Sequence, residues 1–374
     1  MAGNIKKLWI VTELFPPDET STSYIMGEIA NAMTMKYNVG VLCGPEIYDR
    51  RKALDERNKF KLHESIEIHR TEGTGLDKNT TKGKVLSFLL MSFRLMDLVR
   101  KYVKAGDKVL MVTNPAPLVL LMAMLRMRKD FELNILVHDV FPENTRPAEL
   151  KLPFYGLVKH LFDKAYSKAD RLIALGRDMK AVLAAKVSKY NPDLNITVIE
   201  NWADVENIQP RPFPTGKIVL EYAGNIGRVQ GLDKVIERLP EDVELHIYGT
   251  GAMEDRLKAM NRGNVHFHGP YFRSQQTEVL AACDIALVTL QDGMYGLGVP
   301  SKTYNILASG RPILYLGPEG SEIDLLVKEK GIGYCRWPER WDRNILSEMG
   351  ANSRKLAETE YSKETILNKF LTAI

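Results

Sequence analysis

Short apolar runs alternate with longer segments of helical periodicity from one end of the chain to the other. This alternation is typical of parallel sheets whose strands are joined by crossover helices. In the first half of the chain, the predicted strands span residues 8–12, 39–43, 66–69, 109–113, 133–138, 172–174 and 197–200. In the second half, they span residues 218–222, 245–248, 265–267, 285–289, 313–316 and 333–335.

A break separates the two halves at residues 207–216, where NIQPRPFPTG carries three prolines and a glycine. Neither a helix nor a strand continues through such a segment. We therefore predict an α/β fold of two doubly wound, Rossmann-like domains that face a central cleft. The first domain spans residues 1–206, a linker spans 207–216, and the second domain spans 217–355. Residues 356–374 are predicted to form a C-terminal helix that packs back on the first domain.

Composition narrows the class of protein. The chain has 374 residues, of which 45% are hydrophobic and 26% charged, close to the average of soluble globular proteins. Its longest apolar run, residues 118–125, is too short to cross a bilayer, and the N-terminus lacks the apolar core of a signal peptide. We expect a cytoplasmic protein, or one that is peripheral at the cytoplasmic face of the plasma membrane. Three cysteines, Cys43, Cys283 and Cys335, are expected to be reduced core thiols.

Charge argues against a nucleic-acid partner. The net charge of +4 is modest for this length, and no arginine-rich tract interleaved with aromatic residues is present. Positive charge is nevertheless concentrated in two N-terminal segments, 84–104 and 152–168, which also carry long apolar stretches. Either these are basic amphipathic helices that contact anionic lipid, or they are crossover helices buried on the first sheet. The sequence leaves both alternatives open.

The first candidate site is the loop GNIGRVQG, residues 224–231, which lies between a predicted strand and a predicted helix. Three glycines at such a turn let the backbone approach a diphosphate, and Arg228 offers a charge-assisted contact. The alternative is an ordinary glycine-rich turn.

The second candidate site is VPSKTYNILASGRPIL, residues 299–314. Pro300 suits a first helical turn, which places Ser301 and Lys302 beside free backbone N–H groups. A cation at a helix N-terminus opposes the macrodipole, so Lys302 is better explained by an anion bound there. We interpret this segment as a second phosphate contact.

Two other motifs argue against a dinucleotide site and against a metal site. YGTG, residues 248–251, fails as a dinucleotide fingerprint because Glu254 occupies the third glycine position, which disfavours an oxidoreductase. His266 and His268 lie two residues apart with no third ligand nearby, so no metal site is expected.

A predicted buried strand in the first domain ends on His138 and Asp139, within LVHDVFPEN. Side chains at the carboxyl end of a strand face the cleft, and an imidazole beside a carboxylate can act as a base, a proton shuttle or a hydroxyl-binding pair. A histidine that only caps the strand end is the alternative. No Gly-x-Ser-x-Gly elbow indicates acyl transfer.

Several motifs together resemble a known family. EYAGNIGRVQGLD, YGTG, HFHGPY and VPSKTYNILASGRP follow one another in the second half, and FPPDETSTSY, ADRLIALG and VIENWAD occur in the first half. In order and spacing they resemble glycosyltransferase family 4 enzymes of the GT-B fold, and most closely the branch that builds capsular and O-antigen polysaccharides. The resemblance implies a metal-independent, retaining transferase without a cofactor. Its donor would be a nucleotide diphosphate sugar, expected to be a UDP-linked acetamido sugar, and its acceptor a glycan or polyprenyl-diphosphate-linked glycan.

The resemblance also implies roles for individual residues. His138 would point at the transferred sugar, with Asp139 beside it, and the turn at Tyr271 would hold the base through backbone groups. The acceptor-side loop would comprise Pro17, Thr20, Ser21 and Thr22. The remaining donor-binding residues would be Gly224, Asn225, Arg228, Gln230, Gly249, Gly251, Gly298, Ser301, Lys302 and Asn305.

The sequence departs from the family at charged positions. Many members have Arg and Lys where this chain has Asn225 and Gln230, and a ribose-binding Glu where it has Asn305; the first Glu of the family's Glu-x7-Glu motif falls at Leu297. Arg228 and Lys302 are therefore expected to supply the positive charge.

Two rival functions remain at this point. A binding or sensing protein of this fold would have no polar group at the position of His138. A nucleotide-sugar epimerase that hydrolyses its own substrate would need several acidic and basic residues in the first-domain cleft, which the sequence does not identify.

Overall fold

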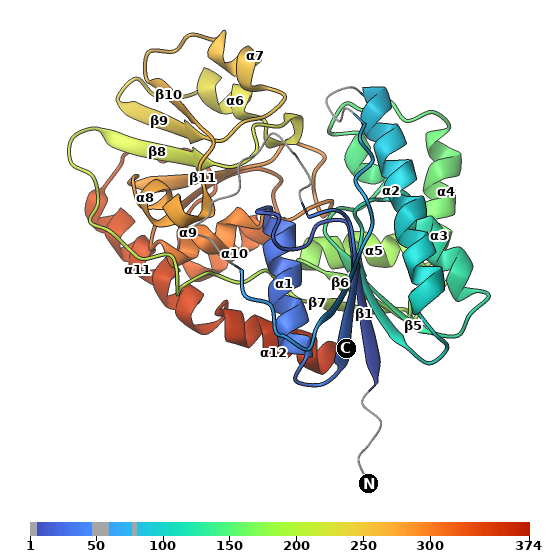
Figure 1. Ribbon diagram of the computed structural model, residues 1–374. Helices are drawn as coiled ribbons and strands as arrows, with labels where there is room; N and C mark the ends of the chain where they lie inside the picture. Colours follow the sequence, from blue (N-terminus) through green and yellow to red (C-terminus); the bar gives the residue numbers. More distant parts are fainter. Residues whose placement is uncertain (1–5, 47–59, 77–80) are drawn as a thin grey trace.

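The computed structural model describes residues 6–46, 60–76 and 81–374, which form two α/β domains, each built on a parallel sheet (Figure 1). The first sheet has the strand order β3-β2-β1-β4-β5-β6-β7. Its strands are β1 (Lys7–Thr12), β2 (Asn38–Cys43), β3 (Glu67–Arg70), β4 (Lys108–Val112), β5 (Glu132–Val137), β6 (Arg171–Ala174) and β7 (Asn195–Val198).

The second sheet has the order β10-β9-β8-β11-β12-β13. Its strands are β8 (Ile218–Ala223), β9 (Val243–Tyr248), β10 (Val265–Gly269), β11 (Ile285–Thr289), β12 (Ile313–Leu316) and β13 (Gly333–Tyr334). Every predicted strand coincides with one of these strands to within two residues at each end. The prediction of two doubly wound, Rossmann-like domains is confirmed.

Helices connect the strands and cover both sheets. In the first domain they are α1 (Ser21–Met33), α2 (Thr81–Tyr102), α3 (Pro117–Arg126), α4 (Tyr155–Tyr166) and α5 (Arg177–Val187), with a short 3₁₀ turn η1 (Glu143–Thr145). The second domain has α6 (Leu232–Glu237), α7 (Glu254–Lys258), α8 (Gln276–Leu280), α9 (Lys302–Ala308), α10 (Glu322–Lys330) and α11 (Arg343–Thr359), with turns η2 (Arg228–Gln230) and η3 (Arg273–Gln275). Helix α12 (Lys363–Ala373) ends the chain.

The central strands β1, β4 and β5 are buried along almost their whole length. Their near-continuous apolar sequences fit this position, because a parallel sheet is covered by helices on both faces. Thr20 precedes helix α1, and its side chain accepts a hydrogen bond from the Ser23 backbone N–H. This N-cap fixes the start of α1, the helix that follows the loop after β1.

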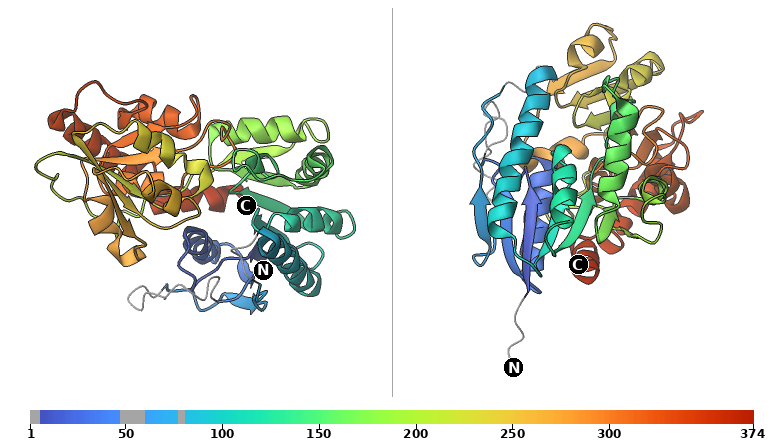
Figure 2. Two further views of the ribbon diagram at one scale, coloured as in Figure 1. Left: turned by 90° about the horizontal axis from the view of Figure 1, so that it is seen from above. Right: turned by 90° about the vertical axis from the view of Figure 1, so that its right-hand side faces the viewer.

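The last helix returns to the first domain (Figures 1 and 2). Ile366 and Phe370 of α12 are fully buried. At the chain end, the Ile374 carbonyl accepts hydrogen bonds from the Tyr37 hydroxyl and the Lys108 ammonium, each at 2.6 Å. Two domains are thus tied together by both the linker and the C-terminal helix.

The domains meet where the carboxyl ends of their strands face each other. The Val140 N–H, just beyond β5, donates to the Leu297 carbonyl at 2.9 Å, and Asp139 forms an isolated antiparallel bridge with Gly298. Main chain from both domains therefore converges beside the cleft. Within the described part of the chain, Cys43, Cys283 and Cys335 are free thiols.

Candidate functional site

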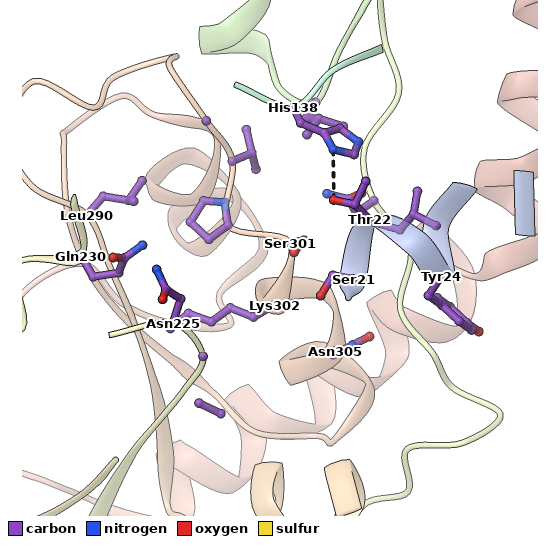
Figure 3. A pocket seen from close by; sticks show the side chains of 18 of the residues that line it. Ser21, Thr22, Tyr24, His138, Asn225, Gln230, Leu290, Ser301, Lys302 and Asn305 are labelled. Atoms are coloured by element: carbon purple, nitrogen blue, oxygen red, sulfur yellow. Dashed lines mark hydrogen bonds between the residues drawn. The ribbon is translucent and has the colours of Figure 1, made fainter. Parts of the chain in front are cut away.

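A cavity of about 500 Å³ lies between the two domains and is lined by residues from both (Figure 3). Its wall includes the following residues predicted from sequence: Ser21, Thr22, His138, Asp139, Gly224, Asn225, Gln230, Tyr271, Gly298, Ser301, Lys302 and Asn305. These residues lie in the loops and in the helices that follow the carboxyl ends of strands, where open α/β sheets bind ligands.

His138 lies directly after β5, and Thr113 holds its backbone in place. The His138 N–H donates to the Thr113 hydroxyl at 3.2 Å, and the His138 ring nitrogen Nδ1 lies 3.5 Å from the Thr22 hydroxyl of α1 (Figure 3). Burial lowers the pKa of His138 to about 4, because the surroundings disfavour the imidazolium. The imidazole is therefore neutral near pH 7, and its buried Nε2 has no hydrogen-bond partner among the described residues.

Asp139 lines the cleft and is exposed to solvent, next to Gly298 of the second domain. A Cβ added to Gly298 would lie 3.1 Å from the Asp139 carboxylate, so a larger residue there would displace this side chain by a few tenths of an ångström. Desolvation of the carboxyl by the surrounding protein atoms raises the pKa of Asp139 to about 6. Asp139 is the only carboxylic acid among the described residues that line the cavity.

Lys302 is the most unusual group on the second-domain side. Its ammonium is buried, lies 3.3 Å from the centre of the Tyr222 ring, and has no hydrogen-bond partner within the described residues. Desolvation lowers the pKa of Lys302 to about 7, and the opposing effect of Glu221 is smaller. Glu221 is itself buried, which raises its pKa to about 8, so it does not neutralise the lysine.

Two amide side chains lie close to Lys302 where the resemblance places Arg and Lys in many relatives. Figure 3 shows Asn225, Gln230 and Lys302 converging on one side of the cavity. The amides pack over Gly227, where an added Cβ would lie 2.5 Å from Gln230 Oε1 and 2.6 Å from Asn225 Nδ2. Tyr222 secures this turn, because its hydroxyl donates to the Asn225 carbonyl at 2.6 Å.

Gly249 and Gly251 do not line the cavity but shape the loop that does. A Cβ at Gly249 would lie 1.9 Å from the Gly224 carbonyl oxygen, and one at Gly251 would lie 2.2 Å from the Ile226 carbonyl oxygen. The Gly224 N–H also donates to the Tyr248 carbonyl at 2.9 Å. Both glycines thus hold the turn after β8 against the turn after β9.

Three other predicted residues lie outside the cavity wall. Arg228, in η2, is exposed to solvent and is absent from the cavity lining. Pro17 and Thr20 precede α1 and shape the loop that presents Ser21 and Thr22. Among the described lining residues, the cations are therefore Lys302 and Arg273.

Arg273 and Tyr24 were not predicted from the sequence. The Arg273 guanidinium lies 3.4 Å from the centre of the Tyr24 ring, across the two domains, and pairs with Asp204 at 2.7 Å. Asp204 in turn donates its backbone N–H to the Asn305 side chain at 3.3 Å. No local motif marks this cluster, since its members are separated widely along the chain and meet only through the domain packing.

Sequence signals did exist for other lining residues. Asn114 follows the carboxyl end of β4, one strand from His138, and a strand-end rule would have selected it. Asn201 and Trp202 belong to the VIENWAD motif, although no role was assigned to them.

The histidines of the second domain lie away from the cavity wall, on β9 and β10. His266 pairs with Glu244 at 2.7 Å, and His268 Nε2 lies 3.1 Å from His246 Nδ1. Across residues 6–46, 60–76 and 81–374, no group of three or more His, Cys, Asp or Glu side chains is arranged to hold a metal ion.

Comparison with known proteins identifies the family. Residues 219–331 match the family described as glycosyl transferases group 1. The probable glycosyltransferase WbjE of Pseudomonas aeruginosa is 30% identical to the chain, over 98% of the chain and 97% of WbjE. The chain belongs to the group 1 glycosyltransferases.

Two further proteins are similar to this chain, one in sequence and one in fold. The glycosyltransferase is 27% identical to the putative colanic acid biosynthesis glycosyl transferase WcaI of Escherichia coli (strain K12), over 48% of this chain and 51% of WcaI. HepE of Anabaena, solved in complex with UDP, shares the fold with a TM-score of 0.68 at 14% identity, over 98% of this chain and 99% of HepE. The predicted GT-B fold is confirmed.

Proposed function

We propose that this glycosyltransferase binds a UDP-linked acetamido sugar in the cavity between its domains. It transfers the sugar, with retention of configuration and without a metal ion, to a lipid-linked or oligosaccharide acceptor in surface polysaccharide biosynthesis. UDP in the HepE structure and the colanic acid pathway in the name of WcaI support the donor and the pathway class. The sequence resemblance to the capsule and O-antigen branch of family 4 supports the sugar and the stereochemistry.

The buried Lys302 ammonium carries the proposal. Arg273, the other cation of the described cavity wall, is already paired with Asp204, whereas Lys302 has no hydrogen-bond partner among the described residues. A buried unpaired cation is costly, and a protein retains one where a ligand supplies the anion. The donor diphosphate is that anion, with Asn225 and Gln230 as neutral hydrogen-bond donors beside it.

Transfer then follows from charge and position. The bond between the anomeric carbon and the diphosphate oxygen breaks, and Lys302 stabilises the charge that develops on the leaving diphosphate. An acceptor hydroxyl forms the new bond on the same face of the sugar and gives its proton to the departing phosphate oxygen. No side chain becomes covalently attached to the sugar in this series of steps.

His138 orients the donor sugar rather than moving a proton. Its low pKa keeps it neutral at physiological pH, and its free Nε2 can hydrogen-bond a sugar hydroxyl. Asp139 lies next to it, with a pKa raised to about 6, and is mostly ionised at pH 7. This pair polarises or positions the sugar and acceptor hydroxyls at the first-domain side of the cavity.

The cavity composition favours transfer over the two rivals. A nucleotide-sugar epimerase that hydrolyses its substrate needs several acidic groups in the first-domain cleft, and among the described lining residues Asp139 is the only one. A binding protein needs no polar group at the position of His138. Both observations support a transferase.

A ligand screen tests the proposal. Thermal unfolding is measured with UDP, GDP, ADP and their common sugar conjugates, for the native protein and for His138→Ala. UDP and a UDP-acetamido sugar should stabilise both proteins, because His138 lies at the sugar and not at the diphosphate. Only the native protein should then transfer sugar to a polyprenyl-diphosphate-linked glycan. Absence of stabilisation by every nucleoside diphosphate would refute the donor assignment.

A further inference from the structure

An apolar surface lies on the outer side of the first-domain helices. Helices α2, α3 and α4 pack side by side on one face of the first sheet (Figures 1 and 2). From its start to Phe93, α2 turns large apolar side chains outward, and Val85 and Phe93 are 55% and 54% exposed. Beyond Phe93, the outward residues of α2 include the charged Asp97 and Arg100. One helix thus changes from an apolar to a charged outer face along its length.

Helix α4 shows the same feature at its beginning. Phe154, the residue before its first turn, is 82% exposed, and Leu157 is 60% exposed on the next turn. Phe154 adopts a left-handed backbone conformation with φ of 54°, which is rare for a bulky side chain. A phenylalanine at position 154 contributes no buried apolar surface to the fold, and its side chain is unfavourable for this backbone conformation. A contact outside the fold explains both properties.

Both apolar regions lie toward the cleft end of the first domain. Helix α4 begins after the loop that leaves β5 and carries His138, and crossover helices run antiparallel to the strands they connect. The first halves of α2 and α4 therefore lie at the end of the domain where the strands deliver His138 to the cavity. A partner bound here would be beside the acceptor side of the cleft.

Charge around this surface favours an anionic partner. Lys151 and Lys164 flank the exposed residues of α4, are themselves exposed, and form no ion pair among the described residues. The acidic Asp163 is already paired with Lys159 and Lys186, each at 2.6 Å. The exposed Glu149 is outnumbered by the exposed basic residues Arg146, Lys151 and Lys164. The first turn of α2 also has lysines in its sequence, at positions 82 and 84, whose side chains lie outside the described part of the structure.

We propose that this surface docks the glycosyltransferase on an anionic lipid bilayer. The apolar side chains insert into the interface, and the lysines contact the headgroups. We call it the docking surface; its residues are Val85, Leu86, Leu89, Phe93, Leu150, Phe154, Leu157 and Leu161. Within the described residues no helix is long and apolar enough to cross a membrane, so contact through these helices would be peripheral. This inference rests on the lipid-linked acceptor of the proposed function, because a bilayer bound here would present such an acceptor at the cleft.

Vesicle flotation tests this surface without donor or acceptor. Three proteins are mixed with phosphatidylglycerol-containing and with phosphatidylcholine vesicles: the native protein, the triple variant Phe93→Ser, Phe154→Asn, Leu157→Ser, and a control. The control, Met35→Ser with Met127→Ser, removes two side chains that are 81% and 62% exposed outside the docking surface. Asn suits the left-handed backbone at position 154, so the triple variant should keep its thermal stability.

We expect the native protein and the control to float with the anionic vesicles, more strongly at low salt. The partition coefficient of the triple variant should fall about tenfold or more, because three inserted apolar side chains are lost. Failure of the native protein to float at low salt, or equal flotation of the triple variant, would refute the proposal. Sedimentation provides a further check: a native dimer that the triple variant dissociates, without vesicle binding, would assign the surface to a second copy of the chain. UDP stabilisation of all three proteins is measured separately, so failure of the donor assignment can be distinguished from failure of the membrane proposal.

Discussion

Lys302 combines a structural cost with a proposed function. Its ammonium lies over the Tyr222 ring, and a cation–π contact recovers only part of the hydration that burial removes. The nearby Glu221 does not compensate, because its own pKa is raised to about 8. A group that destabilises the empty protein and binds the ligand is a common feature of active sites.

Replacement of Lys302 by Met should therefore stabilise the ligand-free protein. The pKa of Lys302 falls from 10.5 to about 7 on folding, so the unfolded chain binds this proton more tightly than the folded one. The cost is fully present below pH 7, decreases as the pH rises, and vanishes above the ordinary lysine pKa. We expect Lys302→Met to raise Tm by about 3 °C or more at pH 6 and by progressively less toward pH 10. Calorimetry across this range checks the trend; a variant less stable than the native protein at pH 6 would contradict it.

Turns between elements shape the donor side of the cavity. The turn after β8 carries Gly224 and Asn225, and the turn after β9 supports it through Gly249 and Gly251. Backbone hydrogen bonds join the two turns. Donor geometry therefore depends on residues that do not touch the cavity.

Substitution of Gly249 should disturb the site from behind. Gly249 has φ of 133°, and a Cβ there would lie 1.9 Å from the Gly224 oxygen, so Gly249→Ala must displace the turn after β8. We expect UDP to bind about tenfold or more weakly, with a loss of about 1–3 kcal/mol in the free energy of unfolding. Gly263→Ala is the matched control, because no atom lies within 4 Å of its added Cβ. Titration calorimetry and urea unfolding measure both effects; native-like UDP binding by Gly249→Ala would show that the turn is not needed.

The sequence predicted elements better than contacts between them. Strands were predictable because the apolar runs of β1, β4 and β5 are buried on both faces. The end of β5 then placed His138 at the cleft, and the helix start after Pro300 placed Lys302 there. Arg228 illustrates the limit, since a positive residue in a glycine-rich loop faces solvent here. The contact of Arg273 with Tyr24 depends on how the domains pack, which no local pattern encodes.

At the scale of the whole molecule, the C-terminal helix joins the end of the chain to its beginning. The Ile374 carbonyl bonds Tyr37 and Lys108 of the first domain, and Arg273 of the second domain stacks on Tyr24 of α1. The first two contacts attach the C-terminal helix to the first domain, and the third joins the two domains directly. Together they restrict how the two domains can move. The first domain thus depends on residues more than three hundred positions away in sequence.

Loss of one buried side chain in α12 should reveal this dependence. Phe370 is 2% exposed in the first-domain core, so Phe370→Ala is expected to lower the free energy of unfolding by about 3–5 kcal/mol. Asn368→Ala, on the exposed side of the same helix, should change it by less than about 0.5 kcal/mol. Urea unfolding of both variants measures the difference. Equal stability of the two variants would mean that α12 does not support the first domain.

The pH dependence of UDP binding tests the central claim most directly. Above pH 7 the terminal phosphate is ionised, with a pKa of about 6, while free Lys302, with its pKa of about 7, loses its proton. Titration calorimetry from pH 7 to 9 should show UDP affinity falling by up to about tenfold per pH unit in the native protein. In Lys302→Met, binding should be weaker by about tenfold to a hundredfold at pH 7. Its remaining fall with pH, which comes from ionisation of Glu221 near pH 8, should be shallower than in the native protein. Uridine, which lacks the diphosphate, should bind both proteins alike. Equal UDP affinity and equal pH dependence in the two proteins would contradict the assignment of Lys302 to the donor diphosphate.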